Sequence, residues 1–192
     1  DVGDANAHAR AEVLVPMLKA WATDTGIEVA SLGIQVHGGM GFVEETGAAQ
    51  HWRDSRIAPI YEGTNGIQAA DLVTRKLGLE DGEALQKLFA DIARDASDEA
   101  QLKALAGECA AIAKWMREDA SLDDRLAGSV PFTTMCAVAV AGWTLVQQHR
   151  AVEDSKDANR KHAKRVTMRF FLDHIVPEAM GLKASATAGA SL

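Results

Sequence analysis

Apolar residues recur at helical spacing through almost the whole chain, and this pattern limits the fold more than any other feature of the sequence. Leucine, isoleucine and alanine return at steps of three and four residues, and no alternation of apolar and polar residues extends beyond a few positions. A chain of 192 residues with 47% hydrophobic content can bury one substantial core. The pattern therefore predicts an all-α protein.

The first part of the chain is expected to form several helices joined by short loops. Gly26 should interrupt a long apolar stretch, and Pro59 should end a later short helix. Thr64 is a suitable N-cap for the helix that follows it, because its hydroxyl can accept a hydrogen bond from a free first-turn amide. The predicted helices cover residues 5–24, 27–36, 45–57 and 64–77.

A polar segment, Gly78–Gly82, separates this part from longer amphipathic helices, and we place a domain boundary there. Two of these helices each show one apolar face, and a third begins after Pro131 and is apolar on nearly all sides. The first face consists of Leu85, Leu88, Phe89 and Ile92, and the second of Leu102, Leu105, Cys109, Ile112 and Met116.

A fourth helix is expected from about Lys156 to Ala179, with an apolar stripe beside a basic one. The apolar stripe is Val166, Phe170 and His174, and the basic stripe is Arg160, Lys161, Lys164, Arg165 and Arg169. Four helices with short links favour an antiparallel bundle. The expected organisation is residues 1–78, an added helical bundle at 79–183, and a frayed tail at 184–192.

Charge and cysteine content exclude several classes of protein. The formal net charge of −7 argues against general binding to nucleic acid or an anionic membrane. Cys109 and Cys136 have no neighbouring cysteine or histidine at zinc spacing, so we expect no metal site and two buried thiols in a reducing cytoplasm.

The most apolar run, Met135–Val146, is too short to span a bilayer. The start at Asp1 has no signal-peptide pattern and reads like a chain cut out of something longer.

Three glycines stand within five residues at His37–Gly41, after Gln35 and Val36. Glycine lacks a Cβ atom and permits positive φ, so the backbone at this point must come close to something. Either a ligand or a tight turn between two helices satisfies that requirement. The residues alone do not choose between them.

Glu62 lies between Tyr61 and Gly63, just before a predicted helix start. A carboxylate on such a loop loses hydration when a ligand closes over it, which makes it a useful general base. The free amides of the helix start can bind a phosphate or an oxyanion. Alternatively, Glu62 caps the helix and is stabilised by the helix dipole. Both interpretations fit the local sequence.

Three motifs in order resemble the end of the catalytic domain of acyl-CoA dehydrogenases. They are the segment from Glu28 through Gln35-Val-His-Gly-Gly39, the segment Arg53-Asp-Ser-Arg56, and the segment Ile60-Tyr-Glu-Gly-Thr-Asn-Gly-Ile-Gln68. Their order and spacing within about fifty residues make a chance match improbable. The continuation beyond Leu77 resembles a longer subgroup of this family, which carries an added helical carboxy-terminal domain.

The resemblance implies that Glu62 removes the α-proton of a fatty acyl-CoA while the β-hydrogen leaves as hydride to FAD. It also implies that the Glu62 amide polarises the thioester carbonyl, as an oxyanion hole does. Some family members carry the base on another helix and have glycine or alanine at this position. This chain keeps Glu62, so it resembles the commoner members that act on straight-chain acyl groups. An acyl-CoA oxidase, which passes the electrons to oxygen, shares the same glutamate. A catalytically silent helical module for oligomerisation is the alternative outside enzymes.

The resemblance further assigns residues to the cofactor. Contacts to the adenosine diphosphate half of FAD, typically that of a neighbouring subunit, fall on Gln35, Val36, His37, Gly38 and Gly39. Flavin contacts fall on Thr64, Asn65 and Gly66. Many family members have glutamine at the position of Gly66, so the side-chain contact is lost and only a backbone contact is expected there. Arg53 and Asp54 match a pair expected to fix the catalytic loop by an ion pair.

Partners follow from the same resemblance. The family passes electrons to an electron-transfer flavoprotein and forms homo-oligomers, either dimers or tetramers. The basic stripe could bind CoA phosphates, but a solvated helix face balanced by the acidic remainder of the chain is the preferred interpretation. The amino-terminal helical domain and the β-domain of the family have no counterpart in this sequence. We therefore expect the chain alone to be colourless and inactive.

Overall fold

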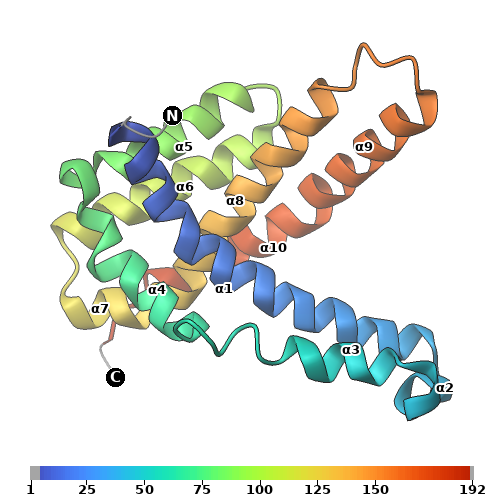
Figure 1. The fold of residues 1–192 in the computed structure, drawn as a ribbon. Coiled ribbons are helices and arrows are strands. Elements are labelled where there is room, and N and C mark those ends of the chain that lie inside the picture. The colour runs from blue at the N-terminus through green and yellow to red at the C-terminus, as the bar shows by residue number, and fades with distance from the viewer. Residues whose placement is uncertain (1–4, 191–192) are drawn as a thin grey trace.

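The computed structural model describes residues 5–190, and every regular element within that range is helical (Figure 1). This confirms the all-α prediction. The elements are α1 (Ala5–Val36), α2 (Gly39–Phe42), α3 (Ala48–Ser55), α4 (Asn65–Thr74), α5 (Glu83–Asp95), α6 (Ala100–Glu118), α7 (Leu122–Ala127), α8 (Ser129–Arg150), α9 (Ala158–Phe170), α10 (Val176–Gly181) and α11 (Lys183–Ala186). Short 3₁₀ segments, Glu44–Thr46 and Lys76–Gly82, and a π-helical turn, Phe171–Ile175, join them.

Helix α1 is a single element of 32 residues, so the expected interruption at Gly26 is wrong. One glycine in a helix costs only about 1 kcal/mol relative to alanine. Packing of α1 against α3, α4 and α8 outweighs that cost. In Figure 1 the first half of α1 crosses the bundle, while its second half extends away from the bundle with α2 and α3 alongside.

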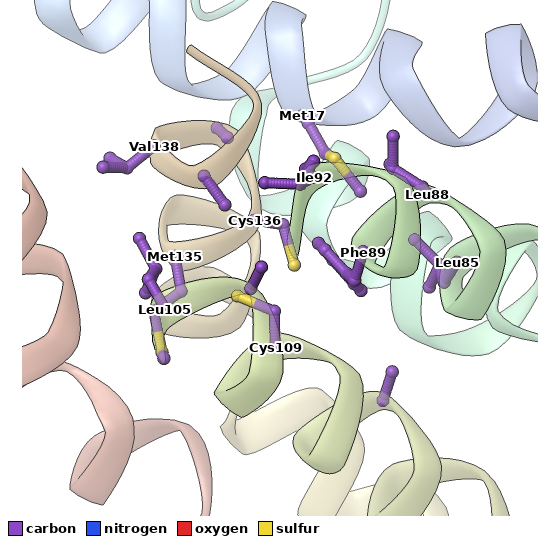
Figure 2. Close-up of a cluster of buried hydrophobic side chains, with 14 of the residues drawn as sticks. Met17, Leu85, Leu88, Phe89, Ile92, Leu105, Cys109, Met135, Cys136 and Val138 are labelled. Carbon is purple, nitrogen blue, oxygen red and sulfur yellow. The ribbon is translucent and has the colours of Figure 1, made fainter. Parts of the chain in front are cut away.

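The core lies where α5, α6 and α8 meet the first half of α1 (Figure 2). The two apolar faces predicted on residues 85–92 and 102–116 are confirmed, since all of their members are buried. Met17 of α1 belongs to the same cluster as Ile92 and Cys136. Both cysteines are free thiols inside this core, as expected, and burial raises the pKa of the Cys136 thiol.

Helix α8 is longer than the apolar run that predicted it, because it continues from Ser129 to Arg150. The helix has 22 residues, and an 18-residue window within it has a mean hydropathy of 1.5, which meets the length and composition of a membrane span. The length argument against a span is therefore wrong. However, 56% of that window is buried inside the protein against other helices. A core helix of a helical bundle shows the same properties.

The fourth predicted helix is present as α9, the π-helical turn and α10, but its buried face differs from the predicted apolar stripe. Val166 and Phe170 are 48% and 60% exposed. The residues that face the core are Met168, Leu172, Val176 and Ala179. Val166 and Phe170 lie in α9 before the π-helical turn, on a different face from Met168, so this stripe is exposed because α9 packs through another face.

The two parts of the chain share one core across the segment Lys76–Gly82. Leu72 and Val73 of α4 pack in the same cluster as Leu88 of α5. Arg10 of α1 pairs with Asp91 of α5 and holds the pKa of that carboxyl below its ordinary value. The described residues before 79 and residues 79–183 are thus closely joined, and the division into two domains at 78 stays a prediction.

The expected fraying from Ala184 is wrong for the residues that the structure describes. Ala186 is fully buried within α11, and its carbonyl lies against Gly128. The Ala190 amide donates to Oδ1 of Asp124 at 2.8 Å, and this bond lowers the pKa of the Asp124 carboxyl. The segment is therefore anchored on α7 and α8. Residues 191 and 192 lie outside the described part.

Replacing Phe89 by alanine should destabilise the chain by about 3–5 kcal/mol, because the change leaves a cavity at a side chain that is only 1% exposed. The matched control is Phe170→Ala, where the same change occurs at a ring that is 60% exposed and should cost less than about 1 kcal/mol. Urea unfolding followed by circular dichroism measures both values. Equal losses would contradict the described core.

Candidate functional site

Glu62 lies in the loop between α3 and α4, and the backbone of this loop is folded tightly on itself. The amides of Ile60 and Tyr61 both donate to the carbonyl of Ile57, at 3.0 and 3.1 Å. The Asn65 amide donates to the Pro59 carbonyl at 3.1 Å, which closes the loop around Glu62. Pro59 is buried beneath it. The loop is therefore an ordered support for the glutamate.

The backbone of Glu62 is left-handed, with a φ of 55°, and Gly63 follows with a φ of 88°. A residue with a Cβ atom adopts this conformation at a cost of about 1–2 kcal/mol. The side-chain amide of Gln68 donates to the Glu62 carbonyl at 3.1 Å and helps to hold it. Such strain is often found at functional sites.

Thr64 caps α4, which confirms the predicted N-cap. Its hydroxyl accepts a hydrogen bond from the Ile67 amide at 3.3 Å. Within residues 5–190 the Glu62 carboxylate accepts no hydrogen bond and its own amide donates none. The alternative in which Glu62 serves as the helix cap is therefore wrong. Glu62 is an exposed residue, so a ligand can reach the loop at this point.

Helix α1 contacts this loop through two residues that the sequence analysis did not single out. Lys19 Nζ donates to the Gly63 carbonyl at 2.7 Å and to Oδ1 of Asn65 at 3.0 Å. Nδ2 of Asn65 donates to the Ala20 carbonyl and to Oγ1 of Thr23, both at 2.9 Å. Lys19 and Thr23 are spaced as neighbours on one helix face, but nothing in the sequence indicated contact with residues more than forty positions away.

A pocket of about 400 Å³ lies beside Asn65 and Gly66, between α1, α4 and α8. Asp24 and Glu28 contribute its acidic side, and Thr133 and Thr134 of α8 line it from the added helices. Asn65 and Gly66, two of the residues predicted to contact the flavin, thus share a pocket with α1 and with α8 of the added helices.

The other predicted cofactor residues lie at the tip formed by the end of α1 and by α2. Gln35 and Val36 are exposed in the last turn of α1, and Nδ1 of His37 lies 2.8 Å from the Gly33 carbonyl. A shallow pocket of about 260 Å³ opens there between His37 and His51.

The glycines of this tip differ in their surroundings: Gly41 forms the tight turn, and a ligand at Gly38 and Gly39 stays a prediction. A Cβ atom on Gly41 would overlap the carbonyl of Ile34, so Gly41 is needed for the tight turn of α2 against α1. A Cβ atom on Gly38 or Gly39 would meet nothing within 4 Å, although Gly38 needs its glycine for a φ of 61°. The backbone of Gly38 and Gly39 is therefore open to a ligand.

The structure brings Glu62, Thr64, Asn65 and Gly66 together but places Gln35–Gly39 elsewhere. Lys19 contacts the loop, and Gln35 lies 16 residues further along the same helix, which is about 24 Å at 1.5 Å per residue. Figure 1 shows α2 at the far end of α1 from the loop that precedes α4. The two groups of residues therefore form separate surfaces within one chain.

The predicted role of Arg53 is wrong. Its guanidinium pairs with Glu44 at 2.8 Å rather than with Asp54, and both partners are exposed. Adjacent side chains on a helix point in different directions, which disfavours a pair between Arg53 and Asp54. The ion pair closes the α2–α3 turn and does not contact the loop of Glu62.

Two family models match the chain. Residues 2–77 match the acyl-CoA dehydrogenase C-terminal domain, and residues 83–192 match the acetyl-CoA dehydrogenase C-terminal-like domain. The chain belongs to the acyl-CoA dehydrogenase family. This agrees with the resemblance of the three sequence motifs and with the all-α fold.

Several acyl-CoA dehydrogenases are similar to the chain. The 3-methylmercaptopropionyl-CoA dehydrogenase of Ruegeria pomeroyi is 40% identical over 91% of this chain and 32% of its own length. A butyryl-CoA dehydrogenase of Syntrophomonas wolfei is 29% identical over 86% of the chain and 30% of its own length. The human mitochondrial short-chain specific acyl-CoA dehydrogenase is 46% identical over 52 residues. The chain spans about a third of the length of the first two relatives.

Gly41→Ala should destabilise the turn between α1 and α2 by about 1–3 kcal/mol, because the added methyl group overlaps the Ile34 carbonyl. Gly39→Ala, two residues earlier in an open position, is the control and should change stability by less than about 0.5 kcal/mol. Hydrogen exchange of α2 and α3 measures the effect. Equal exchange in both variants would contradict the close approach of Gly41.

Proposed function

We propose that the protein containing this sequence is an FAD-dependent acyl-CoA dehydrogenase, which converts an acyl-CoA thioester to the trans-2-enoyl-CoA. One observation carries the proposal. Within residues 5–190 the Glu62 carboxylate and the Glu62 amide form no hydrogen bond, while the carbonyls of Glu62 and Gly63 are held by Gln68 and Lys19. Membership of the family supports the same reaction class.

Glu62 has two roles in this proposal. Its carboxylate accepts the α-proton of the acyl chain as a general base. Its backbone amide donates a hydrogen bond to the thioester carbonyl, where negative charge develops as the proton leaves. A base and an oxyanion donor on one residue reach the α-carbon and the adjacent carbonyl of the same substrate.

The residues present fit an FAD cofactor. When bound, FAD accepts the hydrogen that leaves the β-carbon as a hydride, which balances the loss of the α-proton to Glu62. The hydroxyl of Thr64 and the first-turn amide of Gly66 are available beside Glu62. The side chain of Asn65 is already bound to α1 and its amide to the Pro59 carbonyl, so Asn65 supports the loop and the proposed flavin contacts fall on Thr64 and Gly66.

The separation of the two cofactor surfaces supports a homo-oligomer. Gln35, just before the open backbone of Gly38 and Gly39, lies about 24 Å along α1 from Lys19 at the Glu62 loop, which suits contact with the FAD of a neighbouring subunit. We further propose that the enzyme is cytoplasmic and passes its electrons to an electron-transfer flavoprotein.

Glu62→Gln in the full-length enzyme should lower acyl-CoA-dependent dye reduction by about 10²- to 10⁴-fold, because the amide cannot accept the α-proton. Glutamine keeps the size of the side chain and the backbone amide, so flavin content should not change. Glu153→Gln, an exposed glutamate on the α8–α9 turn, is the control and should keep wild-type turnover.

Wild-type turnover in Glu62→Gln would sink the assignment of the base. Peroxide formation by the unmodified enzyme at the rate of turnover, in the absence of a dye, would replace the dehydrogenase proposal with an acyl-CoA oxidase.

A further inference from the structure

We propose that Lys19 is a positioning residue, which holds the Glu62 loop in its reactive conformation from α1. The inference rests on the proposed function of Glu62 and adds a residue outside the predicted motifs. Lys19 contacts both neighbours of the glutamate. Its ammonium group donates to the Gly63 carbonyl at 2.7 Å and lies 6.0 Å from the centroid of the Tyr61 ring.

The backbone at Glu62 needs such support. Glu62 is one of three residues other than glycine with positive φ in the described part of the chain, and Gly63 directly after it is left-handed as well. A residue remains in this conformation only when its surroundings fix it. Lys19 fixes the carbonyl of Gly63, and Gln68 fixes the carbonyl of Glu62. Both peptide planes after Glu62 are thus held.

The bonding of Lys19 distinguishes it from an ordinary surface lysine. It is half-buried, and within residues 5–190 it forms no ion pair with a carboxylate. Both of its hydrogen bonds go to neutral oxygens of the loop, from Gly63 and Asn65. A bond with a charged donor is stronger than one between neutral groups, so the ammonium group is an effective anchor.

A second anchor lies one helical turn further along α1. Oγ1 of Thr23 accepts from Nδ2 of Asn65, whose Oδ1 accepts from Lys19. Asn65 is the first residue of α4, so this pair fixes the helix start directly after Glu62. The loop therefore cannot move relative to α1 without losing both anchors.

The first test uses hydrogen exchange in the chain itself and does not require FAD or substrate. Lys19→Met should speed exchange of the Tyr61 and Asn65 amides, which are bonded within the loop, by at least about tenfold. Exchange in α6 should not change. Lys87→Met makes the same substitution at a lysine of α5 that pairs with Glu80, and the Glu62 loop should then exchange as in the wild type.

The second test measures kinetics per bound flavin in the full-length enzyme. Lys19→Met should lower kcat about 10- to 100-fold with little change in KM, because the base is displaced while substrate binding is kept. Lys19→Arg keeps a cation that can reach both oxygens and should restore part of kcat. Thr23→Val, which removes only the second anchor, should give a smaller loss than Lys19→Met.

A merely structural role would reduce the yield of flavin-loaded enzyme and leave kcat per flavin unchanged. Wild-type loop exchange together with wild-type kcat in Lys19→Met would overturn the inference, even if Glu62→Gln is inactive. An active Glu62→Gln would instead overturn the proposed function, whatever the exchange data show for the contact between Lys19 and the loop.

Discussion

The unbroken helix α1 is the constraint on which the remaining structure depends. Its first half, with Val13 and Met17, is buried in the core of the added helices. Its middle, with Lys19 and Thr23, holds the loop of Glu62. Its end presents the open glycines beyond Val36. Because 32 helical residues form a rod of about 48 Å, these three regions keep a fixed relation to one another.

The added helices support the candidate site through α1 rather than by supplying the base. Arg10 and Glu12 of α1 pair with Asp91 and with the buried Lys76, and these contacts fix α1 to α5 and to the start of the segment Lys76–Gly82. Helix α8 also lines the pocket beside Asn65. A change in the packing of α5 or α8 would therefore move the surface that carries Lys19. This link gives the carboxy-terminal helices a role in positioning as well as in stability.

The sequence predicted those features that depend on local patterns. The buried faces of α5 and α6 follow from helical periodicity, and Thr64 was recognisable as a cap from its hydroxyl and its place before an apolar run. Features that depend on distant contacts were not predictable in this way. Packing of α1 outweighed the cost of Gly26, and Arg53 paired with Glu44 across a turn. Helix α9 packed through Met168 rather than through Val166 and Phe170.

The same distinction applies to the candidate site. Glu62, Thr64 and Gly66 lie in one short segment, so a sequence motif could indicate them together. Lys19 lies on another helix, and only the folded chain brings its ammonium group to the Gly63 carbonyl. The cofactor contact of Gln35–Gly39 stays a prediction, and the length of α1 places these residues on a different surface of the chain from Glu62.

Proton exchange at the α-carbon tests the central claim most directly, because it isolates the step assigned to Glu62. The full-length enzyme is incubated in D₂O with an acyl-CoA analogue in which sulfur replaces the β-carbon, so that no hydride can leave. Mass spectrometry then follows deuterium at the α-carbon. The account predicts exchange in the wild type, slower exchange in Lys19→Met and none above background in Glu62→Gln. Wild-type exchange in Glu62→Gln would contradict it.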